Sequence, residues 1–87
     1  MASYRVLIKT SAGKELAAVA SKTDRERLVT RIQGLATNPR PYGSEKLAGH
    51  ADRYRVRRGN FRIVYRIDDE ASAVTIFKIG DRRDVYR

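Results

Sequence analysis

The chain contains no cysteine and only one histidine among its 87 residues. Without cysteine, no disulfide, thiolate metal site or cysteine nucleophile is possible, and this absence suits a reducing compartment. We therefore expect a cytoplasmic protein. The single histidine, His50, leaves no two-histidine pair for nuclease acid–base chemistry, so we do not assign it to catalysis.

A long apolar run is also missing. The stretch MASYRVLIKTSAGKE at the start of the chain holds only a short apolar segment, which Arg5 interrupts. Nowhere does an apolar run approach the roughly 20 residues that span a bilayer. We expect no export signal of this type, no membrane-spanning helix and no membrane partner.

Motifs for metals and nucleotides are equally scarce. Asp68, Asp69 and Glu70 are consecutive in the turn-forming stretch DDEAS, where neighbouring carboxylates point in divergent directions. The chain has no GxGxxG or Walker-type loop. The sequence therefore predicts neither a metal site nor a cofactor.

Positive charge dominates what is present. Nineteen Lys and Arg residues against ten Asp and Glu give a formal net charge of +9. Such a field attracts polyanions such as nucleic acid, an anionic membrane surface or an acidic protein. The apolar stripes of the predicted helices are narrow and are required for the core, which argues against the membrane surface. Arginine accounts for most of this charge, and its planar fork suits bidentate phosphate recognition. The composition favours a phosphate-bearing partner.

The length allows one domain, residues 1–87, with a single modest core. The predicted elements are a strand within 3–10 with one well-buried face, helices within 12–22 and 23–36, a connector over 37–49, and strands over 53–58, 61–67 and 73–79. Thr10 or Ser11 is expected to cap the first helix, and Thr23 with Glu26 forms a capping-box pattern for the second. This order, β-α-α-β-β-β, predicts a two-layer α+β fold with the helices on one face of a three-stranded antiparallel meander.

The stretch YRVRRGNFRIVYR predicts a hairpin with sharply different faces. With a two-residue turn at Gly59 and Asn60, Arg57 lies opposite Arg62, whereas a three-residue loop would mix the two faces. One face then carries Tyr54, Val56, Arg58, Phe61, Ile63, Tyr65 and Ile67. The other carries Arg53, Arg55, Arg57, Arg62, Val64 and Arg66.

Opposed like charges weaken a sheet by roughly 0.2–1 kcal/mol per pair. An anion between Arg57 and Arg62 would be held by two guanidinium groups on a rigid platform, as a phosphate or a developing phosphorane requires. The alternative is an ordinary solvated sheet face. This hairpin face has no acidic or neutral polar residue, which favours the anion site.

The stretch GDRRDVYR after the last predicted strand adds further phosphate-binding candidates, Arg82, Arg83 and Tyr86. Positive neighbours favour the phenolate form of a tyrosine, which then acts as a base, and a tyrosine ring also stacks on exposed RNA bases. The alternative is a frayed, solvated terminus.

Three stretches together, NPRPYGSEKLAG, RYRVRRGNFRIVYRIDDE and TIFKIGDRRDVYR, resemble the RelE/ParE superfamily of toxins from prokaryotic type II toxin–antitoxin modules over nearly the whole chain. The RelE branch is the better match, because its basic residues on the first two meander strands and its arginine and tyrosine after the last strand correspond to Arg55, Arg57, Arg62, Arg82 and Tyr86. The chain has arginine where lysine is often found on the first of these strands.

The resemblance implies a toxin that inhibits translation as a metal-independent endoribonuclease, cutting mRNA in the A site of the 30S ribosomal subunit. It implies that Arg57 and Arg62 stabilise the scissile phosphate, Tyr86 activates the 2′-hydroxyl and Arg82 serves the leaving-group side. Arg53, Arg55, Arg66 and Arg83 are the expected RNA-binding residues.

The resemblance also implies a cognate, RelB-like antitoxin as partner, and binding of operator DNA only through the toxin–antitoxin complex. Two alternatives stay open. One is a ParE-like inhibitor of DNA gyrase, and the other is a non-toxic relative whose basic face binds an acidic partner.

Overall fold

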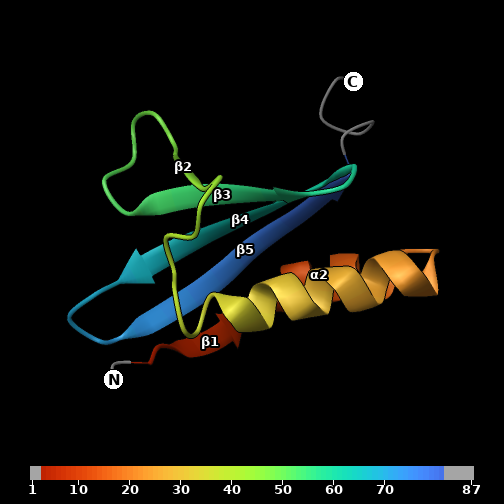
Figure 1. Cartoon of the computed structure of the whole chain (residues 1–87), viewed down its shortest axis with the longest axis horizontal. Helices are drawn as coiled ribbons and strands as arrows, with labels where there is room; N and C mark the ends of the chain where they lie inside the picture. Colours follow the sequence, from red (N-terminus) through yellow and green to blue (C-terminus); the bar gives the residue numbers. More distant parts are fainter. Residues whose placement is uncertain (1–2, 82–87) are drawn as a thin grey trace.

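Within the described part of the chain, five strands form one sheet, and two helices cover one of its faces (Figure 1). The computed structural model describes residues 3–81. The elements are β1 (Arg5–Ile8), α1 (Thr10–Ala17), α2 (Lys22–Gly34), β2 (Glu45–Lys46), β3 (Arg53–Arg58), β4 (Phe61–Asp68) and β5 (Ala73–Asp81). Across the sheet the strand order is β1-β5-β4-β3-β2. The α+β class and the helices on one face are confirmed.

The predicted three-stranded antiparallel meander is incomplete. The meander β3-β4-β5 is present, but β1 joins it as a parallel neighbour of β5, and the short β2 pairs antiparallel with β3. The sheet is therefore five-stranded and mixed. A parallel pairing between the two ends of the chain leaves no local signal, and a two-residue strand is too short to show a period.

As an edge strand, β1 does not have the well-buried face that its alternation predicts. Leu7 and Ile8 are 47% and 45% exposed. Beyond Ile8, α1 takes over the edge of β5: a Glu15 carboxylate oxygen accepts a hydrogen bond from the Ile79 backbone N–H at 3.0 Å, and the other accepts from Lys78 Nζ at 2.9 Å. Burial alone would raise the pKa of Glu15, but these two donors outweigh it and the pKa is lowered.

The helices begin at different caps from those predicted. The N-cap of α2 is Ser21, whose hydroxyl oxygen accepts a hydrogen bond from the Asp24 N–H at 3.2 Å, so the capping box at Thr23 is wrong by two residues. At α1 the N-cap is Lys9 and no side chain caps the helix. Ser, Thr and Asn positions close together compete for this role, and the direction of the incoming chain decides among them.

The core lies between the helices and the central strands β4 and β5. The helical spacing of Leu28, Ile32 and Leu35 predicts an apolar stripe for the second helix, and all three side chains, from α2 and its C-cap, are buried. It packs in one cluster with alternate residues of the sheet, such as Ile63 and Ile76. Each fully buried aliphatic side chain of this size contributes roughly 1.5–3 kcal/mol to folding.

Tyr65 is the largest fully buried side chain of the core, and its hydroxyl needs a partner. It donates a hydrogen bond to the Pro39 backbone carbonyl at 2.7 Å, while its ring stacks on Tyr54 with centroids 6.1 Å apart. Burial raises the pKa of Tyr65, so its hydroxyl stays a donor. This bond ties the connector to the sheet.

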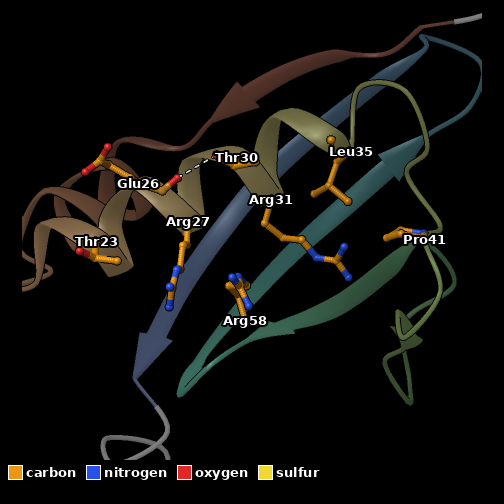
Figure 2. A pocket seen from close by; sticks show the side chains of 9 residues that line it. Thr23, Glu26, Arg27, Thr30, Arg31, Leu35, Pro41 and Arg58 are labelled. Atoms are coloured by element: carbon orange, nitrogen blue, oxygen red, sulfur yellow. Dashed lines mark hydrogen bonds between the residues drawn. The ribbon is translucent and has the colours of Figure 1, made fainter.

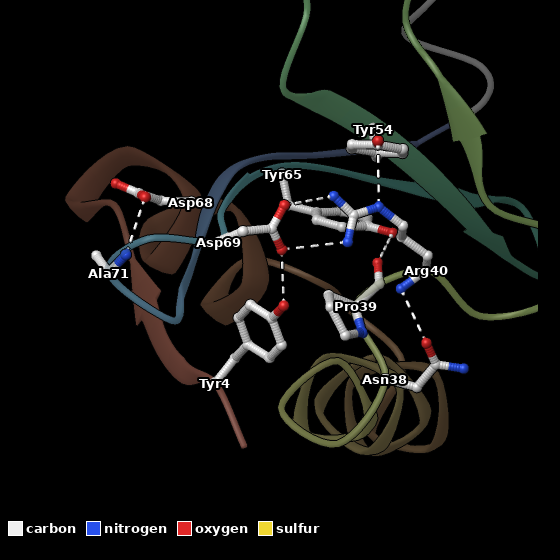
Figure 3. Close-up of polar contacts among 9 residues, drawn as sticks. All are labelled: Tyr4, Asn38, Pro39, Arg40, Tyr54, Tyr65, Asp68, Asp69 and Ala71. Atoms are coloured by element: carbon white, nitrogen blue, oxygen red, sulfur yellow. Dashed lines mark hydrogen bonds and ion pairs between the residues drawn. The ribbon is translucent and has the colours of Figure 1, made fainter. Parts of the chain in front are cut away.

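Arg40, in the same connector, holds three parts of the fold together (Figure 3). Its guanidinium donates to both carboxylate oxygens of Asp69 at 2.9 and 3.3 Å, and its Nε donates to the Tyr54 hydroxyl at 3.3 Å. The Tyr4 hydroxyl donates to the same Asp69 carboxylate at 2.7 Å. Residues from before β1, from β3 and from the β4–β5 turn are thus joined through the Arg40–Asp69 ion pair. We call these four residues the Arg40 clamp.

Because the Arg40 clamp contains a carboxylate, it makes the stability of the protein depend on pH. Arg40, and then Tyr4, hold the pKa of Asp69 below its usual value. A carboxylate whose pKa is lowered by folding stabilises the protein above the ordinary pKa of about 4, and this stabilisation is lost as the pH falls through the lower, folded value. We expect Asp69→Asn to lower the melting temperature at pH 7, and this deficit to shrink as the pH falls towards 2 and the wild-type carboxyl takes up its proton.

The matched control is Glu70→Gln, which removes a neighbouring negative charge that makes no ion pair within residues 3–81. Thermal unfolding followed by circular dichroism at several pH values gives the comparison. A deficit for Asp69→Asn that is the same at pH 7 and pH 2, or that Glu70→Gln reproduces, would contradict the clamp.

Candidate nucleic-acid interface

The β3–β4 hairpin has the register that the sequence predicts. Tyr54 pairs with Tyr65, Val56 with Ile63, and Arg57 with Arg62. The turn contains Gly59 at a φ of +61°, and Asn60 has no positive φ, the pattern of a type II′ turn with glycine at its first central position. The two-residue turn therefore sets the even register, and Arg57 lies directly opposite Arg62.

This register separates the hairpin into the two predicted faces. Val56, Ile63 and Tyr65 are buried under the helices. The opposite face, which we call the cationic face, carries the five predicted arginines, Arg53, Arg55, Arg57, Arg62 and Arg66, together with Val64. On β5 the neighbours of Arg62 and Val64 are Gly80 and Lys78.

Two of these arginines are neutralised by carboxylates from outside the hairpin. Arg66 Nε lies 2.6 Å from a carboxylate oxygen of Asp52, and an Arg55 terminal nitrogen lies 3.0 Å from a carboxylate oxygen of Glu45. Arg66 holds the pKa of Asp52 below its usual range. The expectation of an unmixed positive face thus fails at this end, because acids in the connector and before β3 fold onto it.

An aromatic side chain on β5 engages a third arginine. The Arg53 guanidinium carbon lies 4.1 Å from the centroid of the Phe77 ring, and Lys9 Nζ approaches the same ring at 5.4 Å. Phe77 stands in the irregularity of the β4–β5 ladder, where Val64 pairs with Lys78 and Tyr65 pairs with Ile76. Neither Phe77 nor Lys9 is predicted as a site residue from the sequence, because the position of Phe77 depends on this bulge and that of Lys9 on the pairing of β1 with β5.

Arg57 and Arg62 are the remaining pair. Within residues 3–81, neither makes an ion pair with a carboxylate. With Gly59, Asn60 and Phe61 they line a small hollow at the tip of the hairpin. Two opposed, uncompensated guanidinium groups on a rigid strand pair can bind an anion bidentately from both sides.

The other predicted site residues fall outside this geometry. Arg82, Arg83 and Tyr86 lie outside the described residues. His50 is exposed in the loop before β3. In the acidic turn, Asp68 accepts a hydrogen bond from the Ala71 N–H at 3.0 Å and Asp69 belongs to the Arg40 clamp, so both carboxylates have structural roles. Among residues 3–81, no three His, Asp or Glu side chains gather as a metal site would require.

Comparison with known proteins places the chain in a family. A family model described as the ParE toxin of the type II toxin–antitoxin system, parDE, matches residues 6–86. The chain belongs to the RelE/ParE superfamily of type II toxins. A curated relative, Toxin RelG of Mycobacterium tuberculosis, is 30% identical over 84 residues, which cover 97% of both chains.

Solved structures agree with this membership. The archaeal RelE–RelB complex from Pyrococcus horikoshii contains a chain with 28% identity and a TM-score of 0.81, covering 92% of this chain and 96% of that one. The toxin–antitoxin complex RelBE2 of Mycobacterium tuberculosis contains one with 30% identity and a TM-score of 0.82, covering 94% of both chains. The predicted family is confirmed.

Because Arg57 and Arg62 repel each other, we expect that removing one of the two charges stabilises this RelE/ParE member. Arg62→Gln removes the repulsion with Arg57, and we expect it to raise the free energy of unfolding by up to about 1 kcal/mol at low ionic strength. The gain shrinks in 1 M NaCl, where the Debye length falls to about 3 Å.

Arg66→Gln is the control on the same strand and the same face, because Arg66 also lies opposite an arginine, Arg53, but its charge is compensated by the ion pair with Asp52. We expect it to leave stability unchanged or lower. Urea unfolding of the three proteins at low and high salt measures the difference. Equal destabilisation by both substitutions would show that Arg57 and Arg62 do not repel each other in the folded protein.

Proposed function

We propose that this RelE/ParE-superfamily member is the toxin of a type II module and acts as an endoribonuclease that cleaves mRNA in the ribosomal A site. The observation that carries the proposal is the Arg57–Arg62 pair, opposed across the hairpin with no carboxylate partner among residues 3–81. Val56 precedes Arg57 and Ile63 follows Arg62, and their buried side chains fix both strands to the core. Such an arrangement supports binding of a phosphate.

The proposed reaction is an attack of the ribose 2′-oxygen on the adjacent phosphorus. The new bond joins the 2′-oxygen to phosphorus, the bond to the 5′-oxygen of the next nucleotide breaks, and the products are a 2′,3′-cyclic phosphate and a 5′-hydroxyl. Negative charge grows on the phosphoryl oxygens in the transition state, and Arg57 and Arg62 would stabilise it.

Arginine stays charged at neutral pH and is a poor proton carrier, so groups other than Arg57 and Arg62 must transfer the protons of the reaction. We assign removal of the 2′-hydroxyl proton to Tyr86. Arg82 would stabilise charge on the leaving oxygen, which takes up a proton from solvent.

The remaining arginines of the cationic face would hold the RNA backbone on either side of the cut. Arg53, Arg55 and Arg66 are assigned to this role, and so is Arg83, which lies outside the described residues. The ion pairs with Glu45 and Asp52 orient Arg55 and Arg66 and reduce their net charge, so we expect them to contribute less than Arg57 and Arg62. Within residues 3–81 the hollow beside Arg57 and Arg62 is small, about 30 Å³, and such a shallow sheet face suits a substrate presented as single-stranded mRNA by the 30S A site.

We also propose a cognate RelB-like antitoxin as partner, with operator DNA bound only through their complex. RelE–RelB complexes among the similar structures support this. An apolar groove of about 380 Å³ runs along β1 and the helices, lined by Val6, Ile8, Leu16, Val29 and Ile32 among others. An amphipathic segment of the antitoxin would cover it, and the cytoplasm would hold both partners and the ribosome.

A second candidate function is inhibition of DNA gyrase by binding alone. The match of a ParE family model to residues 6–86 favours this alternative. The cationic face would then contact a polyanion or an acidic protein surface, and no bond would be cleaved. The two candidates differ in what they damage, mRNA or DNA.

The test is primer extension on a translated transcript, with ribosomes programmed in vitro and with brief expression in cells. We expect cuts in phase with codons, and Arg57→Ala and Arg62→Ala should each reduce cleavage roughly 100–1,000-fold, the usual effect of removing one donor from a charged transition state. Arg82→Ala should do the same. Lys14→Gln, an exposed cation on α1, is the control and should cut normally.

Normal cleavage by both Arg57→Ala and Arg62→Ala would overturn the assigned mechanism. Intact mRNA with gyrase-linked DNA breaks would support the gyrase alternative. Unimpaired growth and translation without any partner would overturn both and indicate a non-toxic binding relative. Circular dichroism of each variant confirms that it is folded.

A further inference from the structure

A second group of arginines lies on the opposite side of the hairpin from the cationic face. Arg27, Arg31 and Arg58 line a cavity of about 400 Å³ between α2 and the end of β3 (Figure 2). The rest of the lining comes from Thr23, Glu26, Thr30, Gly34, Leu35 and Pro41. We call this the arginine cavity.

The fold itself brings these three side chains together. Arg27 and Arg31 are one helical turn apart on α2, so they project from the same face of the helix. Arg58 is the last residue of β3 and lies on the helix-facing side of the sheet, two residues after the buried Val56. In Figure 2 the side chains of Arg27 and Arg31 descend from α2 on either side of Arg58.

The arginine cavity carries an excess of positive charge, three arginines against one glutamate in its lining. Within residues 3–81, none of its three arginines forms an ion pair. Glu26 is its one acidic lining residue, and Figure 2 shows the Glu26 carboxylate directed away from the guanidinium groups. Three positive side chains around one space repel one another, and an anion would remove that repulsion.

Arg31 also carries an unused donor. Its Nε is buried and has no hydrogen-bond partner in the described part of the chain, and one terminal nitrogen reaches the Tyr42 carbonyl only at 3.5 Å. Buried donors in folded proteins are almost always paired, so Arg31 has hydrogen-bonding capacity that its own neighbours leave unused. A phosphate oxygen is an acceptor that matches the guanidinium fork.

We propose that the arginine cavity binds a backbone phosphate of RNA, as a second contact in addition to the one on the cationic face. Tyr42 favours RNA over an acidic peptide: it is fully exposed, follows Pro41 at the rim, and offers a ring on which a base stacks. Arg57 and Arg58 are consecutive and lie on opposite faces of β3, so one RNA strand passing the hairpin tip reaches both sites.

The choice of RNA rests on the proposed function, whereas the binding of a phosphate does not. The probe is a fluorescently labelled, single-stranded RNA dodecamer without ribosomes, bound to the folded protein and followed by anisotropy over a range of salt concentrations. Each phosphate contact on a single strand contributes about 0.7 to the slope of log affinity against log salt.

The test variant is Arg27→Gln with Arg58→Gln, which leaves the partly buried Arg31 in place. We expect the salt slope to fall by about 0.7, the loss of one phosphate contact. The matched control is Arg5→Gln with Lys14→Gln, which removes the same charge from exposed positions outside the cavity and should leave the slope unchanged. Tyr42→Ala should weaken binding roughly 5- to 150-fold, the value of one stacked base, without changing the slope.

A slope that is the same in the wild type and the cavity variant would overturn the proposal, and so would an equal fall in the control. Binding of an acidic peptide that requires Arg27 and Arg58, with the RNA slope unchanged, would also overturn it and assign the cavity to a protein partner. A reduced slope with no cleavage of ribosome-bound mRNA would support the arginine cavity while overturning the proposed function. Thermal unfolding of the cavity variant shows that it folds.

Discussion

The two-residue turn at Gly59 and Asn60 is the constraint on which the rest of the structure depends. Because side chains alternate along a strand, a shift of one residue in the β3–β4 register would move every core residue of the hairpin to the outer face. Gly59 adopts a φ of +61°, which glycine reaches without steric cost, and the turn then allows only the even register. The same choice that buries Ile63 places Arg57 opposite Arg62.

The free energy gained by burying one face of the hairpin exceeds the repulsion between arginines on the other face. The hydrophobic contribution of a few buried side chains, at roughly 1.5–3 kcal/mol each, exceeds the roughly 0.2–1 kcal/mol lost by opposing two arginines. The Arg40 clamp and the Tyr65 hydroxyl strengthen the far end of the sheet by holding the connector against it. The hairpin therefore stays folded with Arg57 and Arg62 unpaired by carboxylates within residues 3–81, and both remain available for binding an anion.

Positive charge is not spread evenly over the sheet. At the end of the hairpin near the connector, Glu45 and Asp52 neutralise two arginines. At the tip, Arg57 and Arg62 on one face and Arg58 on the other have no carboxylate partner within residues 3–81. An RNA strand would therefore meet the strongest attraction at the tip. The two proposed anion sites, the Arg57–Arg62 pair and the arginine cavity, therefore both lie near the tip of the hairpin.

The sequence by itself determined the features that depend on neighbours in the chain: the strands β3, β4 and β5, the buried stripe of α2, the hairpin register and the family. Alternation and turn chemistry act over a few residues, so a sequence displays them directly. Only the tertiary structure decided which charges meet. The parallel pairing of β1 with β5, the approach of Glu45 to Arg55, and the gathering of Arg31 with Arg58 join residues far apart in the chain. Such contacts depend on how the layers pack, and no local pattern encodes them.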